Sequence, residues 1–194
     1  MRGIAERSSV QYLLQALSLS EICVLLCQLL LRTGHGNTIA KFVLDWSGPV
    51  ELYVTPGFAC GFAMAVGGAL LRLQCYRALG SNFTFNLTIR KDHALATTGP
   101  YAIVRHPGYA AVLLYGWSYY FCHFGKGSWW QECGISDTTF GRVIGVVLLL
   151  FNLAVSLSAV KRCKLEDEVL KQEFGKQWEK WAHKTPYIMI PYVY

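Results

Sequence analysis

Charged residues are scarce in this sequence: Asp, Glu, Lys and Arg make up 15% of the 194 residues, whereas 53% are hydrophobic and 14% are aromatic. A soluble domain of this length needs more polar side chains to cover its surface. The composition therefore excludes an ordinary soluble domain and favours a protein embedded in a membrane.

The motifs of common cofactor and metal sites are also missing. The sequence has no Gly-x-Gly-x-x-Gly between a strand and a helix, no P-loop and no His-Glu-x-x-His. Its seven cysteines form no Cys-x-x-Cys pair. Cys23 and Cys27 share a helix face but have no further ligands nearby. We therefore expect neither a soluble nucleotide-binding fold nor a metal.

The net charge of +6 does not by itself indicate nucleic-acid binding. The Lys and Arg residues lie between long apolar runs and form no recognisable RNA- or DNA-binding pattern. An anionic membrane face or an anionic substrate accounts for them better, so we expect no nucleic-acid partner.

Four stretches approach the roughly 20 mainly apolar residues that a transmembrane helix needs, namely 9–31, 51–72, 107–124 and 142–160. The position of the first also allows a signal peptide, but no small-residue cleavage site follows it, so we interpret it as a span. In the second, Gly57 and Gly61 have the spacing that lets helices approach closely. The sequence thus predicts an all-α integral membrane protein, a bundle of about four transmembrane helices with a cytosolic C-terminal helical segment.

Basic residues are distributed unequally between the two sides that these spans define. Two lie in the N-terminal tail, five in or beside the loop at 73–106 and seven after the last span, against four on the opposite side. Since basic residues favour the cytosolic side, the loop at 73–106 and the segment at 161–194 are predicted to be cytosolic. Two glycosylation sequons, at Asn82 and Asn86, would then remain unused.

The segment from Thr97 to Tyr109 contains the most unusual local sequence. Pro100 disfavours helix in the residue before it, whereas Pro107 suits the first turn of the following helix. Arg105 and His106 then lie at the N-terminal edge of that helix, where free N–H groups attract a carboxylate or phosphate. The alternative is that these side chains merely anchor a helix at the membrane interface.

A second group of polar residues follows the last span. Leu170, Phe174, Trp178 and Trp181 step by four, four and three residues and predict an apolar helical stripe, which Glu166 and Arg162 extend toward the membrane. The alternatives are a solvated acidic surface and an ordinary ion pair between Arg162 and Glu166.

At these residues the sequence resembles the isoprenylcysteine carboxyl methyltransferase family, membrane enzymes that methylate the C-terminal carboxylate of prenylated proteins. The resemblance runs from about Gly80 to the C-terminus, and order and spacing agree together. Its elements are Gly80-Ser81-Asn82-Phe83, His93, Gly99-Pro100-Tyr101, Arg105-His106-Pro107-x-Tyr109, Arg162, Glu166-Asp167, Leu170 and Phe174-Gly175.

The resemblance implies S-adenosylmethionine as the cofactor and a prenylated protein C-terminus or a prenylcysteine as the acceptor. The isoprenyl chain is expected to lie between the spans, and the lipid bilayer is the other expected partner. The predicted spans and the extent of the resemblance divide the chain into a transmembrane hairpin at 1–72 and a catalytic region at 73–194. The resemblance implies the endoplasmic reticulum, and the distribution of basic residues predicts that the site faces the cytosol. Arg162, Glu166 and Lys184 are the implied catalytic residues. The implied cofactor-binding residues are His93, Tyr101, Arg105, His106, Pro107, Tyr109, Glu166 and Asp167. Oligomeric state is left open.

The chain departs from the family pattern at a few positions. Asp167 stands where the family usually has a second Glu, Trp178 and Trp181 where it has paired tyrosines, and Lys184 where it often has an arginine. The shorter Asp is expected to reach less far into the site, and Lys184 gives up bidentate recognition of a carboxylate.

Three other functions fit parts of the sequence. A phospholipid N-methyltransferase would share the cofactor site, but its amine acceptor must also lose a proton. The ending at 185–194 resembles that of membrane sterol reductases, which use NADPH. A membrane scaffold or lipid-binding protein could keep the motifs without activity. The acceptor and the source of label in a transfer assay distinguish these possibilities.

Overall fold

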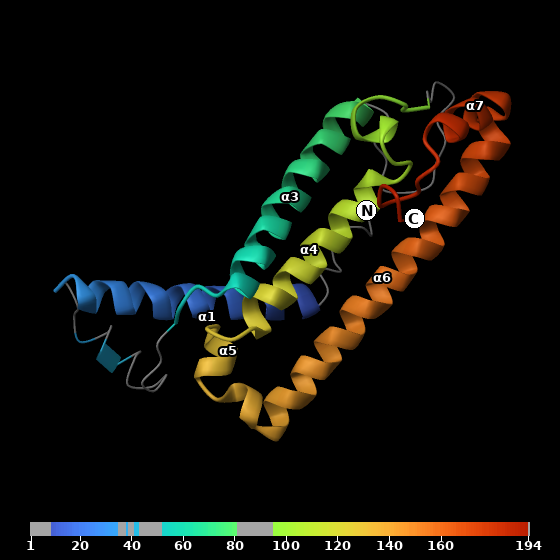
Figure 1. The fold of residues 1–194 in the computed structure, drawn as a ribbon. Helices are drawn as coiled ribbons and strands as arrows, with labels where there is room; N and C mark the ends of the chain where they lie inside the picture. Colours follow the sequence, from blue (N-terminus) through green and yellow to red (C-terminus); the bar gives the residue numbers. More distant parts are fainter. Residues whose placement is uncertain (1–8, 35–37, 39–40, 43–51, 81–94, 194) are drawn as a thin grey trace, which may run out of the picture. The chain divides into compact units, whose positions relative to one another are not determined.

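The computed structural model describes residues 9–34, 38, 41–42, 52–80 and 95–193, which form helices and no strand (Figure 1). The long helices are α1 (Ser9–Arg32), α3 (Pro56–Leu79), α4 (Pro107–Phe124) and α6 (Thr139–Phe174). Shorter elements are η2 (Gly99–Ala102), α5 (Trp129–Glu132), η3 (Ile135–Asp137) and α7 (Lys176–Lys184). The all-α prediction is confirmed for this part of the chain.

The chain divides into two compact units. One comprises residues 1–60 and 120–147, and the other comprises residues 61–119 and 148–194. The second unit contains every predicted site residue that the structure describes. The predicted division into a hairpin at 1–72 and a catalytic region at 73–194 stays a prediction.

Two of the described helices, α3 and α6, are long and apolar enough to cross a membrane. Only 17% of the apolar window of α3 and 11% of that of α6 is buried, so neither is the covered core helix of a soluble fold. At 36 residues, α6 measures about 54 Å, well beyond the roughly 30 Å hydrocarbon core of a bilayer. These helices support a membrane protein, whereas the predicted count of four spans is not confirmed.

The ends of α3 differ from the predicted span at 51–72. Thr55 precedes the helix, and its hydroxyl accepts a hydrogen bond from the Phe58 N–H at 3.1 Å. Pro56 opens the helix, where its missing N–H costs nothing. At the other end the helix continues to Leu79, so Arg72 lies inside it rather than at the edge of a loop. Residues 73–79, which were predicted to belong to the loop, are therefore helical.

The last span was predicted at 142–160, which lies inside α6, and a helical stripe was predicted to continue through Trp181. The structure instead breaks the helix at Gly175, which has a φ of 46°. A helix cannot continue through this positive φ, so Trp178 and Trp181 belong to the separate helix α7.

Small side chains bring the helices of the second unit together. Buried Ala110, Cys163 and Met189 form a cluster that joins α4, α6 and the C-terminal segment. At Gly68 of α3, a Cβ atom would lie 3.1 Å from the Ala111 carbonyl oxygen of α4. The close approach of α3 and α4 thus depends on a glycine, as small residues permit between membrane helices.

Unit one includes the loop that joins α4 to α5. The Gly127 N–H donates to the Glu132 carboxylate at 2.9 Å. Gly127 has a φ of 81°, and a Cβ there would lie 2.4 Å from the Tyr53 carbonyl oxygen. The Ser18 hydroxyl on α1 and the His123 ring on α4 are 3.2 Å apart. None of the predicted site residues takes part in these contacts.

Candidate functional site

The backbone before α4 holds two side chains at the start of that helix. Gly99 has a φ of 60°, which a residue before proline can adopt most easily without a side chain. Pro100 lies in the short helix η2, and Pro107 is the buried first residue of α4, as predicted. Arg105 and His106 thus immediately precede the helix, where the sequence placed them.

The C-terminal segment fixes the same stretch of backbone. The Arg105 N–H donates to the Tyr187 carbonyl at 2.9 Å, and the His106 N–H donates to the Ile188 carbonyl at 2.8 Å. We call residues 185–189 the C-terminal clamp. This role could not be predicted, because the partners lie about 80 residues apart and no local motif marks backbone pairing at that distance.

Two further hydrogen bonds attach α7 and the C-terminal clamp to η2. The buried Trp181 indole N–H donates to the Tyr101 carbonyl at 3.0 Å. The Thr185 hydroxyl donates to the Ala102 carbonyl at 3.4 Å. Both donors are almost fully buried, at 6% and 2% exposure. Trp181 therefore packs against the site, although it stands where the resemblance implied a tyrosine.

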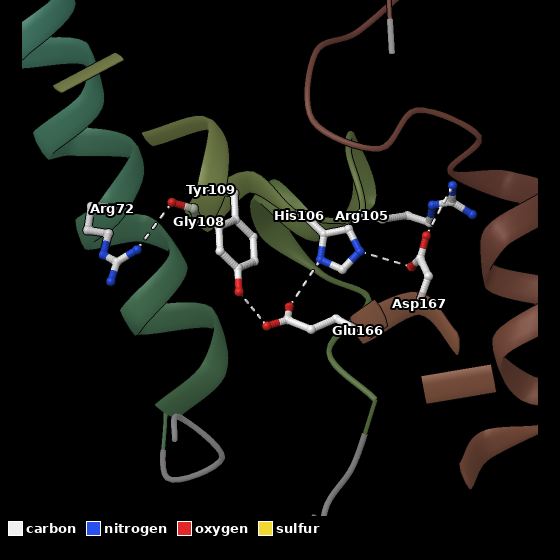
Figure 2. Close-up of polar contacts among 7 residues, drawn as sticks. All are labelled: Arg72, Arg105, His106, Gly108, Tyr109, Glu166 and Asp167. Atoms are coloured by element: carbon white, nitrogen blue, oxygen red, sulfur yellow. Dashed lines mark hydrogen bonds and ion pairs between the residues drawn. The ribbon is translucent and has the colours of Figure 1, made fainter. Parts of the chain in front are cut away.

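The imidazole of His106 lies between the two acids of α6, as Figure 2 shows. Its Nδ1 is 3.4 Å from Glu166 Oε2, and its Nε2 is 2.9 Å from Asp167 Oδ1. The His106 side chain is 4% exposed, against 26% for Glu166 and 13% for Asp167. One nearly buried imidazole thus engages both carboxylates.

A flanking residue on each side completes what we call the acid–imidazole cluster: Arg105, His106, Tyr109, Glu166 and Asp167. The Tyr109 hydroxyl donates to Glu166 Oε1 at 2.5 Å. On the other side, Arg105 Nη2 is 3.3 Å from Asp167 Oδ2. The first half of the cluster comes from the start of α4 and the second from α6 (Figure 2). The predicted pairing of these two segments is therefore present in the structure.

The acids control the ionisation of His106. Burial alone would lower its pKa, but hydrogen bonds to Asp167 and Glu166 and the negative charges of both carboxylates raise it above the ordinary value. The cluster therefore favours an imidazolium. At η2, burial raises the pKa of Tyr101, with further contributions from Cys75 and Glu166. Tyr101 is thus a neutral hydroxyl close to Glu166.

Two buried donors beside the cluster lack an acceptor. Among the residues that the structure describes, Arg105 Nε and Trp178 Nε1 have no hydrogen-bond partner. The Arg105 guanidinium carbon lies 5.6 Å from the centre of the Trp178 ring, so the two donors are close neighbours. Because an unsatisfied buried donor costs free energy, this pair is a natural place for acceptor atoms of a ligand.

The remaining predicted site residues form no side-chain hydrogen bond or ion pair with the acid–imidazole cluster in the part of the chain that the structure describes. Arg162 is exposed on α6, one turn before Glu166, and its charge acts on the Tyr109 hydroxyl. Within the described ranges it forms no ion pair with Glu166, so that simple alternative does not account for either residue. Lys184 is exposed at the end of α7, and no described hydrogen bond or ion pair joins it to the cluster. His93 lies outside the described residues.

One residue near the cluster was not predicted as part of the site. Arg72 of α3 donates from Nη1 to the Gly108 carbonyl at 3.1 Å and from Nε to the Tyr76 hydroxyl at 2.8 Å. Arg72 was predicted only as one of the five basic residues in or beside the loop at 73–106. Its position inside an apolar helix is the signal that would have marked it as a functional candidate.

Together these features define a class: a helical protein in which the described helices α3 and α6 are long and apolar enough to cross a membrane and a polar cluster lies where α4 begins. The isoprenylcysteine carboxyl methyltransferase (ICMT) family matches at residues 61–121, which include Arg105–Tyr109. The sequence comparisons support membership of that family and confirm the resemblance found from the motifs.

Curated relatives give the same result. Protein-S-isoprenylcysteine O-methyltransferase B of Arabidopsis thaliana is 29% identical over 128 residues, which are 65% of this chain and 55% of the relative. A probable protein-S-isoprenylcysteine O-methyltransferase of Oryza sativa subsp. japonica is 28% identical over 127 residues, 64% of this chain and 56% of the relative. The chain thus matches little more than half the length of these relatives. No solved structure matches it.

Proposed function

We propose that this protein methylates the C-terminal carboxylate of prenylated cysteine, with S-adenosylmethionine as methyl donor. The observation that carries the proposal is the acid–imidazole cluster, in which Arg105, His106 and Tyr109 meet Glu166 and Asp167 in a chain similar to the ICMT family. The prenylated acceptor is a protein C-terminus or a free prenylcysteine.

The donor set around the cluster fits this cofactor. Arg105 Nε and Trp178 Nε1 need acceptors, and S-adenosylmethionine carries a carboxylate, ribose hydroxyls and ring nitrogens that can serve. Glu166 and Asp167 are acceptors for its hydroxyl or amino groups. In this proposal His106 binds at the methionine end, while Tyr101, Tyr109, His93 and the backbone around Pro107 complete the binding surface.

Methyl transfer to a carboxylate requires the protein mainly to position the two reactants. When bound, the cofactor supplies a methyl group on a sulfonium; the S–CH₃ bond breaks with its electron pair going to sulfur, as the carboxylate oxygen forms the new bond to carbon. No proton moves, so no general base is required. The chain's residues must hold the acceptor in line and exclude water. Arg162 and Lys184 are proposed to attract and orient the carboxylate.

The lipid part of the acceptor is proposed to lie against the membrane helices. Leu150, Leu153 and Leu157 of α6 are 59%, 40% and 65% exposed, and their spacing places them on one face. Each buried CH₂ of an isoprenyl chain contributes about 0.8 kcal/mol, which a polar surface could not supply. The membrane is proposed to be the endoplasmic reticulum, with the cluster on the cytosolic side.

The first test removes the cluster's central residues. We expect His106→Ala and Glu166→Ala each to lower methyl transfer to N-acetyl-S-farnesylcysteine at least about a hundredfold, since each leaves buried charges unpaired. Transfer is measured with labelled S-adenosylmethionine and purified protein in nanodiscs. Membrane insertion, followed by carbonate extraction, should be unchanged.

Glu168→Ala provides the matched control, because Glu168 is an exposed acid on the same helix. It should retain wild-type turnover. Full activity in both His106→Ala and Glu166→Ala would contradict the site assignment. The comparisons favour neither the phospholipid N-methyltransferase nor the sterol reductase alternative.

A further inference from the structure

Arg72 is a half-buried cation on a membrane-length helix. Its printed contacts are with neutral acceptors, the Tyr76 hydroxyl and the Gly108 carbonyl, and its guanidinium also lies 5.0 Å from the centre of the Tyr76 ring. Among the described residues, no carboxylate lies within ion-pair distance of Arg72. A positive charge is thus held in an apolar helix without an anion.

The interhelical contact alone does not explain the choice of arginine. A bond to one carbonyl needs a single donor, whereas a guanidinium carries five in a planar fork. Nε and Nη1 are used, and Nη2 has no protein partner in the part of the chain that the structure describes. Because charged side chains in membrane helices are costly and usually functional, the unmatched charge indicates an anionic ligand.

Arg72 is close to the cluster but on a different side from Arg105. Figure 2 shows it beyond Gly108 and Tyr109, away from Asp167. Tyr109 connects the two regions, because its hydroxyl donates to Glu166. The charges of Arg72 and Glu166 also both act on Tyr101, the cation lowering and the anion raising its pKa. Arg72 is therefore near enough to the acid–imidazole cluster for its charge to act on a residue that Glu166 also influences.

We propose that Arg72 binds the carboxylate of the lipid acceptor. This inference rests on the proposed function and assigns the two arginines different partners: Arg105 with Trp178 serves the cofactor, and Arg72 serves the acceptor. A planar guanidinium matches a carboxylate in shape and charge and holds it in a fixed direction. Arg162 and Lys184, both exposed, then act at longer range.

The test compares two ligands that differ only at the carboxyl group, which is charged in one and a neutral amide in the other. N-acetyl-S-farnesylcysteine carries the carboxylate, and its primary amide does not. Binding of both to the full chain in nanodiscs is measured for wild type, Arg72→Gln, Arg72→Lys and Arg77→Gln. Arg77 is the matched control, because it is an exposed arginine on the same helix.

We expect wild type and Arg77→Gln to prefer the acid over the amide by about tenfold to a hundredfold, as for a charge-assisted hydrogen bond. Arg72→Gln should lose this preference through weaker binding of the acid alone, and Arg72→Lys should recover part of it. Affinity for S-adenosylmethionine should change less than about twofold.

Two results would overturn the assignment. One is an acid preference in Arg72→Gln as large as in Arg77→Gln. The other is a parallel loss of affinity for the acid, the amide and S-adenosylmethionine, which would make Arg72 a structural tie between α3 and α4. Methyl transfer by wild type is measured separately, so failure of the proposed function is distinguishable from failure of the Arg72 assignment.

Discussion

Asp167 is a shorter acid than the resemblance implied, and it still contacts Arg105 and His106 of the cluster. Asp is one methylene shorter than the Glu that the resemblance implied, and it was expected to reach less far. Yet Asp167 lies 2.9 Å from His106 Nε2 and 3.3 Å from Arg105 Nη2. Both partners immediately precede α4, so the short side chain suffices. In the cluster, each charged side chain is thus paired with an oppositely charged neighbour: Asp167 contacts Arg105 and His106, and His106 also contacts Glu166.

The pH dependence of stability follows from His106. Its folded-state pKa is raised above 6.5, so its contribution to the free energy of unfolding is complete below about 6.5 and is lost as pH rises through the raised value. Asp167→Asn removes the leading cause of the rise. As pH rises, we therefore expect the melting temperature of Asp167→Asn to begin to fall at a lower pH than that of wild type.

Differential scanning fluorimetry of the apoprotein between pH 5.5 and about 9 checks this, because the titration range begins near the ordinary histidine pKa. Glu168→Ala serves again as the exposed-acid control. Superimposable pH profiles for wild type and Asp167→Asn would show that His106 is not held in its charged form by the acids.

The sequence predicted much of the cluster and little of what surrounds it. Arg105, His106, Glu166 and Asp167 were found because two short motifs concentrate charge beside apolar runs. Arg72 was missed because its partner, the Gly108 carbonyl, lies 36 residues away in sequence. Local patterns carry no information about such a contact, which arises only when α3 packs on α4.

At the scale of elements, the break between α6 and α7 sets where the tryptophans lie. The periodicity of Leu170, Phe174, Trp178 and Trp181 fits one continuous helix, but a positive φ at Gly175 ends it. The prediction failed because hydrophobic spacing outweighed the glycine, which can adopt a positive φ that ends a helix. Turning the chain there brings Trp181 onto the Tyr101 carbonyl.

Substitution of Gly175 tests this element directly. The methyl group of Gly175→Ala meets no neighbour within 4 Å, so the cost comes from the positive φ of the backbone alone, about 1–3 kcal/mol of unfolding free energy. Gly67→Ala, which also meets no atom within 4 Å but lies inside a helix, is the control. Thermal unfolding should show a loss only in Gly175→Ala, and equal melting temperatures would contradict the break.

The C-terminal clamp is the second element that sequence reasoning did not predict. Truncation after Lys184 removes the carbonyl acceptors of the Arg105 and His106 N–H groups. Because each N–H group then loses one hydrogen bond, we expect S-adenosylmethionine binding to weaken by about tenfold or more. Truncation after Met189 keeps these bonds and should bind like wild type. Equal affinity in the two truncated proteins, measured by calorimetry, would show that the clamp does not support the site.

For the whole molecule, composition predicted the class and the structure supports it through two long, poorly buried apolar helices. The predicted count of four spans is not confirmed, because apolar content alone does not distinguish a helix that crosses the membrane from a shorter one packed beside it. The predicted cytosolic location of residues 73–106 and 161–194 follows from charge distribution. It is checked by peptide-N-glycosidase treatment, which should leave gel mobility unchanged, whereas a shift would place Asn82 or Asn86 in the lumen.

Methyl transfer by the purified wild-type protein tests the central claim most directly. The protein in nanodiscs is given labelled S-adenosylmethionine with either N-acetyl-S-farnesylcysteine or phosphatidylethanolamine as acceptor. The proposed function predicts label in the base-labile methyl ester of the prenylcysteine and none in the phospholipid. Label confined to phosphatidylethanolamine, or no transfer to either acceptor, would contradict it.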